Sequence, residues 1–214
     1  MVVVSIIIPV KNRLEFTRAC LHSIQATKPQ IPYEIIVVDN ASDDGTGEFL
    51  HAQTESGNLI WIYNDPPRPF AASCNRGAAR ASGEFLLFIN NDTVALPGWL
   101  EELCRPIEAN ARIGAVGAKL LYPDDTIQHA GVAFHYFKEL KVCGPYHIFR
   151  TFPRYALAVS KEREFQAVTG ACMLTSRAVF DELGGFDEQF INCFEDVDYC
   201  LRLRECGYKV VYTP

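Results

Sequence analysis

Short apolar runs alternate along the first half of the chain with segments whose apolar residues recur at helical spacing. The apolar runs cover residues 2–10, 34–39, 58–64 and 84–90, and the helical segments cover 14–27, 43–55, 71–81 and 97–110. Strands this apolar are usually covered on both faces, and their alternation with helices requires right-handed crossovers between parallel strands. We therefore predict an α/β fold with a mostly parallel central sheet flanked by helices, in which residues 1–120 form a Rossmann-like, doubly wound half.

The regular alternation weakens beyond residue 120. The segment 134–163 is rich in aromatic and basic residues but lacks periodicity, so we expect an irregular lobe or a mobile loop there. A solvated surface loop is favoured over a segment that covers an acceptor substrate or contacts anionic lipid headgroups, and the lipid contact would make the protein peripheral to a membrane.

Regular structure is predicted again towards the end of the chain. The pattern indicates ordered structure over 165–176, a short helix over 177–183 and an amphipathic helix over 197–206 that Gly207 ends. The last residues, KVVYTP, are typical of a strand, and the chain stops where a connection is expected. We therefore expect a single domain over 1–214, with a second half over 121–214 that is truncated at its C-terminus.

Composition narrows the class of protein. With 214 residues, of which 49% are hydrophobic and 21% charged, the chain suits one globular domain. Its net charge of -6 argues against nucleic acid as a partner. Eight cysteines without a C-x-x-C pair favour reduced, mostly buried thiols and hence a cytoplasmic location, possibly at the cytosolic face of a membrane. The apolar start of the chain is too short for a transmembrane segment.

Polar residues follow three of the predicted strands, where open α/β sheets bind their ligands. The segments that contain them are Pro9-Val10-Lys11-Asn12-Arg13, Asp39-Asn40-Ala41-Ser42 and Asn90-Asn91-Asp92. No G-x-G-x-x-G follows the first strand, which disfavours NAD and FAD. Alone, an aspartate such as Asp39 or Asp92 at a strand end is more often a turn residue or a helix cap than a ligand-binding group. Together, they suit a site in which one carboxylate contacts a base or ribose and the other holds a hard cation on a diphosphate.

Three carboxylates crowd the predicted start of the last helix: Glu195, Asp196 and Asp198. Acidic residues are favoured at a helix N-terminus by the macrodipole, which is a purely structural explanation. Alternatively, neighbouring carboxylates raise one another's proton affinity, which suits a base that takes the proton of an acceptor hydroxyl. Both interpretations stay open at this point.

The order of five motifs resembles glycosyltransferase family 2, the inverting enzymes of the GT-A fold. The motifs are SIIIPVKNR, EIIVVDNASDDGT, NRGAARASGEFLLFINND, VTGACMLTSRAVFDELGGFDE and FEDVDYCLRLRECGY, and they extend over nearly the whole chain. The GGFDE…FEDVD form is most similar to non-processive, rhamnosyltransferase-like members that act on bacterial surface polysaccharides. Processive relatives carry a QxxRW motif and membrane spans, and this sequence has neither.

The resemblance implies a nucleoside-diphosphate sugar as donor, a glycan, lipid-linked or other hydroxyl compound as acceptor, and Mg²⁺ or Mn²⁺ as cofactor. It implies that Asp92 binds the metal and that Asp196 is the catalytic base, with Glu195 as its partner or substitute. The residues that it implies for donor binding are Pro9, Val10, Asn12, Asp39, Asn75, Asn91, Gly170 and Ala171. The resemblance makes residues 1–120 the nucleotide-binding half and residues 121–214 the acceptor and catalytic half. We expect Asp39, Asp92 and Asp196 to converge on one cleft.

Two departures from the family pattern affect these expectations. Asn90 and Asn91 stand where many relatives have acids, so metal affinity without nucleotide should be weak. A histidine that is sometimes a metal ligand further along the family sequence has no counterpart here, and His129 and His147 are interpreted as loop or surface residues. Two alternatives remain: a sugar-phosphate nucleotidyltransferase, for which PVKNR is a poor phosphate loop, and an inactive carbohydrate- or nucleotide-binding module.

Overall fold

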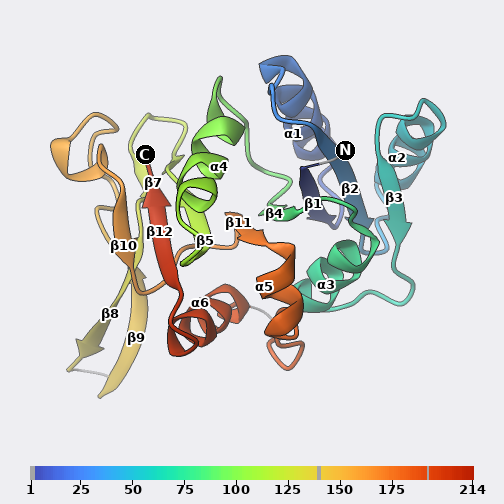
Figure 1. Ribbon diagram of the computed structural model, residues 1–214. Helices are drawn as coiled ribbons and strands as arrows, with labels where there is room; N and C mark the ends of the chain where they lie inside the picture. Colours follow the sequence, from blue (N-terminus) through green and yellow to red (C-terminus); the bar gives the residue numbers. More distant parts are fainter. Residues whose placement is uncertain (1–2, 139–140, 192) are drawn as a thin grey trace.

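The computed structural model describes residues 3–138, 141–191 and 193–214. Within them, one eight-stranded sheet has the order β10-β12-β5-β11-β4-β1-β2-β3 (Figure 1). Its parallel strands are β1 (Val4–Val10), β2 (Tyr33–Asp39), β3 (Ile60–Tyr63), β4 (Phe85–Ile89), β5 (Ile113–Ala118) and β12 (Lys209–Thr213). The antiparallel strands are β10 (Arg163–Phe165) and β11 (Cys172–Ser176). The predicted mostly parallel sheet is therefore confirmed.

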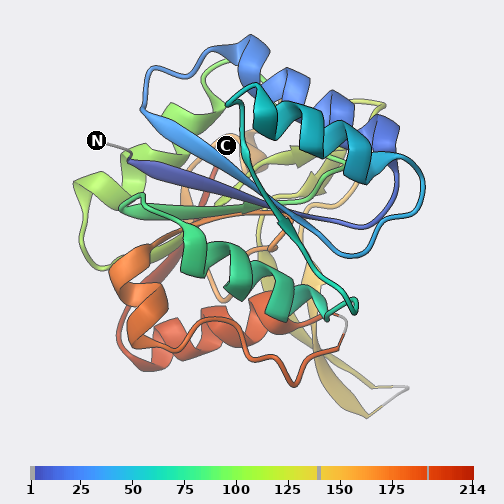
Figure 2. The same cartoon turned by 90° about the vertical axis from the view of Figure 1, so that its right-hand side faces the viewer.

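Helices cover both faces of the sheet (Figures 1 and 2). One face carries α1 (Leu14–Thr27), α2 (Thr46–Glu55) and α4 (Trp99–Ala109), and the other carries α3 (Phe70–Arg80), α5 (Arg177–Glu182) and α6 (Glu195–Glu205). Because successive side chains of a strand point to opposite faces, Ile6 and Ile8 pack in the core under α1 while Ile7 packs in the core under α3. All three are fully buried, which explains why β1 is apolar without a break.

Most predicted boundaries in the first half agree with the structure, and α1 has the predicted bounds. The helix predicted over 97–110 begins only at Trp99, because Gly98 before it has a φ of 79°, so Pro97 does not lie in its first turn. The helix predicted over 43–55 likewise begins later, at Thr46. Asp44 stays outside it because its carboxylate accepts hydrogen bonds from the backbone of Leu14 and from Thr46.

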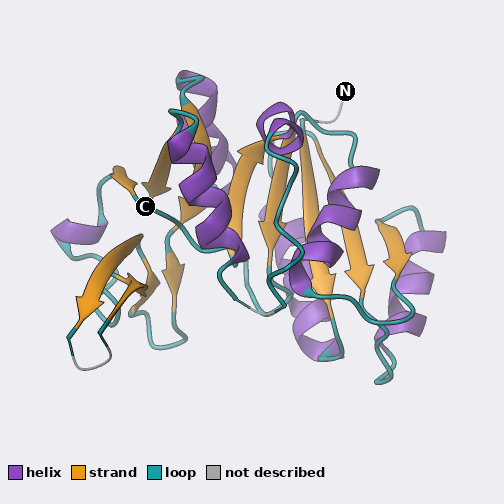
Figure 3. Cartoon of the chain, turned by 90° about the horizontal axis from the view of Figure 1, so that it is seen from below, coloured by secondary structure: helices purple, strands orange, loops and turns teal. Residues whose placement is uncertain are grey.

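The expectation of an irregular lobe or loop over 134–163 was wrong for its first part, apart from residues 139–140, which lie outside the described residues. Strands β8 (Val132–Phe137) and β9 (Val142–His147) form an antiparallel hairpin, and η1 (Leu157–Val159) follows. The hairpin extends from the end of the molecule that carries β10 and β12 (Figures 1 and 3). It largely lacks a buried face, so its sequence lacks the one-sided alternation that identifies a strand.

The second half of the chain completes the sheet of the first. Strand β11 pairs with both β4 and β5, and β12 lies between β5 and β10. A small additional sheet joins β6 (Leu120–Leu121) to β7 (Ile127–His129). Five of the eight cysteines are buried and all eight are free, as the sequence predicted. No helix among the described residues is both long and apolar enough to traverse a lipid bilayer.

Close packing of α3 on the sheet generates a prediction about stability. A Cβ atom at Gly77 would lie 2.5 Å from Cγ2 of Ile7 and 3.1 Å from Cγ2 of Val38, both in the buried core. We expect Gly77→Ala to lower the free energy of unfolding by about 1–3 kcal/mol through overpacking, despite the higher helix propensity of alanine. Urea denaturation measures this change.

Gly144→Ala in β9 is the matched control. A Cβ atom there would make only an ordinary contact, 3.5 Å from Cε2 of Phe137. Its stability should change by no more than about 0.5 kcal/mol. Equal stability of the two variants would contradict close packing at Gly77.

Candidate active site

The polar residues predicted at the strand ends lie along one edge of the sheet. Strands β1, β2 and β4 are parallel, so their carboxyl ends meet at this edge. Antiparallel β11 begins at the same edge, and the backbone N–H of Asn90 donates to the carbonyl of Ala171 at 3.0 Å. The residues after β4 and those before β11 are therefore direct neighbours.

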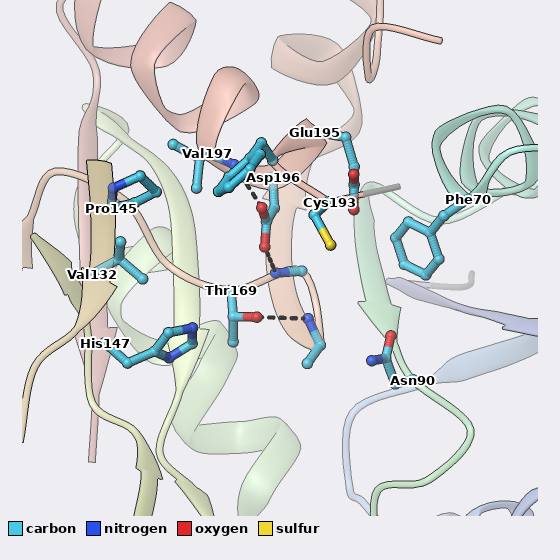
Figure 4. Close-up of a pocket in the computed structure, with 13 residues that line it drawn as sticks. Phe70, Asn90, Val132, Pro145, His147, Thr169, Cys193, Glu195, Asp196 and Val197 are labelled. Carbon is cyan, nitrogen blue, oxygen red and sulfur yellow. Dashed lines mark hydrogen bonds between the residues drawn. The ribbon is translucent and has the colours of Figure 1, made fainter. Parts of the chain in front are cut away.

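A cavity of about 490 Å³ opens at this edge (Figure 4). Phe70 and Asn90 form one side of it, Glu195 and Asp196 come from the start of α6, and Thr169, Gly170 and Ala171 form part of its wall. The opposite side is formed by Val132, Pro145 and His147 of the β8–β9 hairpin (Figure 4). The cavity is thus lined by residues from both halves of the chain.

Asp196 is held in a fixed orientation in the first turn of α6. Its Oδ2 accepts the backbone N–H of Gly170 at 2.6 Å, and its Oδ1 accepts the N–H of Val197 at 2.8 Å. Gly170 allows this approach because even a Cβ atom there would lie 3.2 Å from Cβ of Asp196. Each carboxylate oxygen keeps a second lone pair, so the side chain can still accept a proton.

Glu195 lies beside Asp196 but in a drier environment. It is 7% exposed, and its Oε2 has no hydrogen-bond partner among the described residues. Burial, with a smaller contribution from the charge of Asp196, raises the pKa of Glu195. Asp198 has a structural role instead, because it binds Arg202 at 2.8 Å and Arg202 also donates to the carbonyls of Leu183 and Gly185.

The turn Asn90-Asn91-Asp92 is anchored to α1. The amide of Asn91 donates to Oγ1 of Thr17 at 3.0 Å, and Oγ1 of Thr93 donates to the carbonyl of Asn90 at 2.8 Å. Asp92 is exposed and lines a second cavity of about 700 Å³, which shares Asn90 and Ala171 with the first. The structure therefore brings Asp92 and Asp196 to adjoining cavities.

Asp39 lies on the same edge but lines neither of these two cavities. It is fully buried, and its Oδ1 accepts the N–H of Ser42 at 3.0 Å. Asn12 connects the same loop to the end of β1, since its backbone N–H donates to Ser42 and its side chain accepts from Asp43. Pro9 and Val10 end β1 directly beside Asp39, so these residues form one unit separate from Asp196.

Asn75 does not line the cavity of Asp196. Its amide donates to the carbonyl of Phe186 at 2.8 Å and accepts the N–H of Phe186 at 3.0 Å. It lines another cavity, together with Gly185 and Glu188. These hydrogen bonds connect α3 to the loop that precedes α6.

The interpretation of His129 as a loop or surface residue was wrong. His129 ends β7, is fully buried, and its Nδ1 lies 2.9 Å from the carbonyl of Ala118. Its Nε2 accepts the N–H of Thr169 at 3.3 Å, and burial lowers its pKa to about 3. His147 is exposed but lines the cavity, as does Phe70, and sequence reasoning identified neither of them as a site residue. The segment around His147 has no periodicity from which its direction could be inferred.

Three buried oxygens without a hydrogen-bond partner belong to this edge: Asp39 Oδ2, Asn90 Oδ1 and Glu195 Oε2. Unpaired buried acceptors cost free energy, so those of Asn90 and Glu195, which both line the cavity of Asp196, indicate a place where a ligand supplies donors or a cation. The described residues contain no group of three His, Cys, Asp or Glu side chains that could hold a metal ion. Asp92 and the amide oxygen of Asn90 nevertheless offer the hard oxygen ligands that suit Mg²⁺ or Mn²⁺, provided that a phosphate completes the site.

Known proteins share sequence and fold with this chain. The O-antigen biosynthesis protein RfbC of Myxococcus xanthus is 37% identical over 98% of this chain, which spans 16% of that protein. An N-acetylglucosaminyl-diphospho-decaprenol L-rhamnosyltransferase of Mycobacterium tuberculosis is 26% identical over 86% of this chain and 64% of its own length. The crystal structure of GalNAc-T7 with UDP, GalNAc and Mn²⁺ superposes with a TM-score of 0.80 at 17% identity, over 100% of this chain and 42% of that chain.

The fold is therefore the GT-A fold that the motifs predicted. The sequence model of glycosyl transferase family 2 matches residues 5–184, which include the strand ends, the turn that carries Asp92 and the loop of Gly170. With this match over most of its length, the chain belongs to glycosyl transferase family 2.

Proposed function

We propose that this chain transfers one sugar from a nucleoside-diphosphate sugar to a hydroxyl group of an acceptor, with inversion at the anomeric carbon. One observation carries the proposal: two backbone N–H groups hold the carboxylate of Asp196 at a cavity that adjoins the turn carrying Asp92. A fixed base beside a phosphate-binding turn is the arrangement that such a transfer needs.

The donor would extend along the edge of the sheet. Pro9, Val10, Asn12 and Asp39 would surround the nucleoside, a role supported by the unpaired, buried Oδ2 of Asp39. Asn91 would lie near the ribose, and Gly170 and Ala171 near the transferred sugar. For Asn75 we propose an indirect role, because its amide already binds Phe186.

In the proposed reaction, Asp196 accepts the proton of the acceptor hydroxyl while the oxygen attacks the anomeric carbon. The bond between that carbon and the diphosphate oxygen breaks as the new glycosidic bond forms, and the nucleoside diphosphate leaves. Glu195, whose pKa is raised by burial, would hydrogen-bond the donor sugar or share the proton of Asp196. A divalent cation at Asp92 and Asn90 would neutralise charge on the departing diphosphate.

The names of the relatives support a coarse assignment of the pathway. RfbC is named for O-antigen biosynthesis, and the mycobacterial relative is named for transfer of rhamnose to a diphospho-decaprenol compound. We propose that this chain acts in the synthesis of a bacterial surface glycan on a glycan or lipid-linked acceptor. The chain spans only 16% of the length of RfbC, so any substrate assigned to this protein by that likeness is part of the proposal.

Incubation with a panel of UDP-, GDP-, TDP- and CDP-sugars and Mn²⁺ tests the activity. We expect slow release of nucleoside diphosphate from one donor class, because water can replace the acceptor as nucleophile. Formation of pyrophosphate from nucleoside triphosphate and sugar phosphate would instead identify a nucleotidyltransferase. Nucleotide binding without turnover would identify an inactive binding module.

Asp196→Asn should lower the rate of nucleoside diphosphate release by about 10²–10⁴-fold, since a general base contributes about that much. The variant should still bind the nucleoside diphosphate, as measured by thermal shift. Asp181→Asn, on the exposed surface of α5, is the matched control and should retain full activity. Near-normal turnover of Asp196→Asn would reassign the base, first to Glu195.

Glu195→Gln should raise stability at pH 7 while it lowers activity. Because the folded state raises the pKa of Glu195 above its usual value of 4.5, ionisation of this group at neutral pH costs stability. The gain in Tm over the wild type should be full above the raised pKa and shrink to zero as the pH falls below 4.5. If the Tm difference between Glu195→Gln and the wild type grew as the pH fell, the ionised Glu195 carboxylate would not be the group that costs stability.

Asp92→Asn should remove the part of nucleotide binding that depends on Mn²⁺. Mn²⁺ alone should raise the Tm of the wild type only slightly, whereas nucleoside diphosphate and Mn²⁺ together should raise it strongly. A nucleotide concentration of 100 times the Kd should stabilise the folded state by about 2.7 kcal/mol. The variant should show the same shift with and without the metal. Asp125→Asn removes a charge from the same cavity and should behave as the wild type, whereas an equal loss in both variants would contradict a metal site at Asp92.

A further inference from the structure

The two sides of the Asp196 cavity come from different parts of the fold. Asn90 lies on one side and belongs to the turn that carries Asp92, so this is the side of the proposed diphosphate. In Figure 4, Val132, Pro145 and His147 lie on the other side, with Asp196 and Thr169 between. In an inverting displacement, the nucleophile enters opposite to the leaving group. The hairpin side of the cavity is therefore the side from which an acceptor would approach.

His147 is available for a ligand, in contrast to its neighbour His129. No hydrogen bond joins the His147 ring to another residue in the described part of the chain, and its side chain is exposed at the cavity wall. Both nitrogens of His129 are occupied, one by the carbonyl of Ala118 and the other by the N–H of Thr169. The two rings pack edge to face with centroids 5.3 Å apart, so the buried ring supports the exposed one.

The electrostatic surroundings favour a neutral His147 ring. Partial burial lowers its pKa, as does Arg150, while the nearby Asp196 acts in the opposite direction. A neutral imidazole has one donor and one acceptor nitrogen, which matches a sugar hydroxyl that can both accept and donate. Val132 and Pro145 add apolar surface of the kind that packs against the C–H groups of a sugar ring.

We infer that the β8–β9 hairpin forms the acceptor-binding wall of the cavity and that His147 hydrogen-bonds a hydroxyl of the acceptor's terminal sugar. This inference rests on the proposed function and names a residue that determines acceptor specificity. The base of this hairpin is anchored next to the catalytic edge, because Val132 exchanges backbone hydrogen bonds with Ala167.

The test measures nucleoside diphosphate release by the full chain with Mn²⁺ and the best donor, in the presence of p-nitrophenyl glycosides of N-acetylglucosamine, rhamnose, galactose and mannose. At least one glycoside should accelerate release by the wild type. In His147→Ala the KM for that glycoside should rise about 3- to 10-fold, the loss expected for one hydrogen bond. The KM for the donor should change less than twofold, and His147→Gln should recover part of the glycoside affinity.

His135→Ala is the matched control on the same hairpin. The His135 ring packs against Phe137 and Tyr146 and does not line the cavity, so this variant should retain both KM values. An unchanged glycoside KM in His147→Ala, or an equal rise in donor KM, would overturn the inference. So would a wild type that hydrolyses the donor but responds to no glycoside. A wild type that releases no nucleoside diphosphate contradicts the proposed function itself, and this inference with it.

Discussion

The hydrogen bond from the backbone of Gly170 to Asp196 determines the geometry of the candidate site. It connects the residues before β11 to the start of α6, and a side chain at residue 170 would crowd it, because a Cβ atom there would lie 3.2 Å from Cβ of Asp196. Because β11 pairs with β4, the same contact sets the distance from Asp196 to the turn that carries Asp92. The proposed base therefore lies in the first turn of α6, and the proposed metal ligand lies in the turn that directly follows β4.

The edge of the sheet that carries the site contains strained backbone and unpaired polar atoms. Asn12, Arg13, Ala41 and Phe194 have left-handed backbone conformations, with φ between 57° and 72°, at the ends of β1 and β2 and before α6. The same edge holds the unpaired oxygens of Asp39, Asn90 and Glu195. Strain and unpaired polar atoms both cost stability, and the packed strands and helices supply the compensation. This distribution is expected where a rigid scaffold presents groups for a ligand.

Two different kinds of structure form the two sides of the cavity. The proposed donor side consists of strand ends and helix starts of a doubly wound sheet, where position follows from the repeating βα pattern. The proposed acceptor side is a hairpin outside the central sheet, since β8 and β9 pair only with each other in the described sheets. Such an addition can change without disturbing the core, which suits a wall that recognises the more variable substrate. His129 lies at the boundary and holds the Thr169 loop in place from the buried side.

The sequence by itself determined the alternating strands and helices, the polar residues at the strand ends and the acidic start of α6, because these follow from local periodicity and from the geometry of parallel sheets. It predicted Asp39 and Asp92 as site residues from their place after a strand. Only the tertiary structure decided that Asn75 binds Phe186, 111 residues away, that His129 is buried against Thr169, 40 residues away, and that His147 lines the cavity. These contacts depend on long-range packing, which no local pattern of hydrophobic and polar residues encodes.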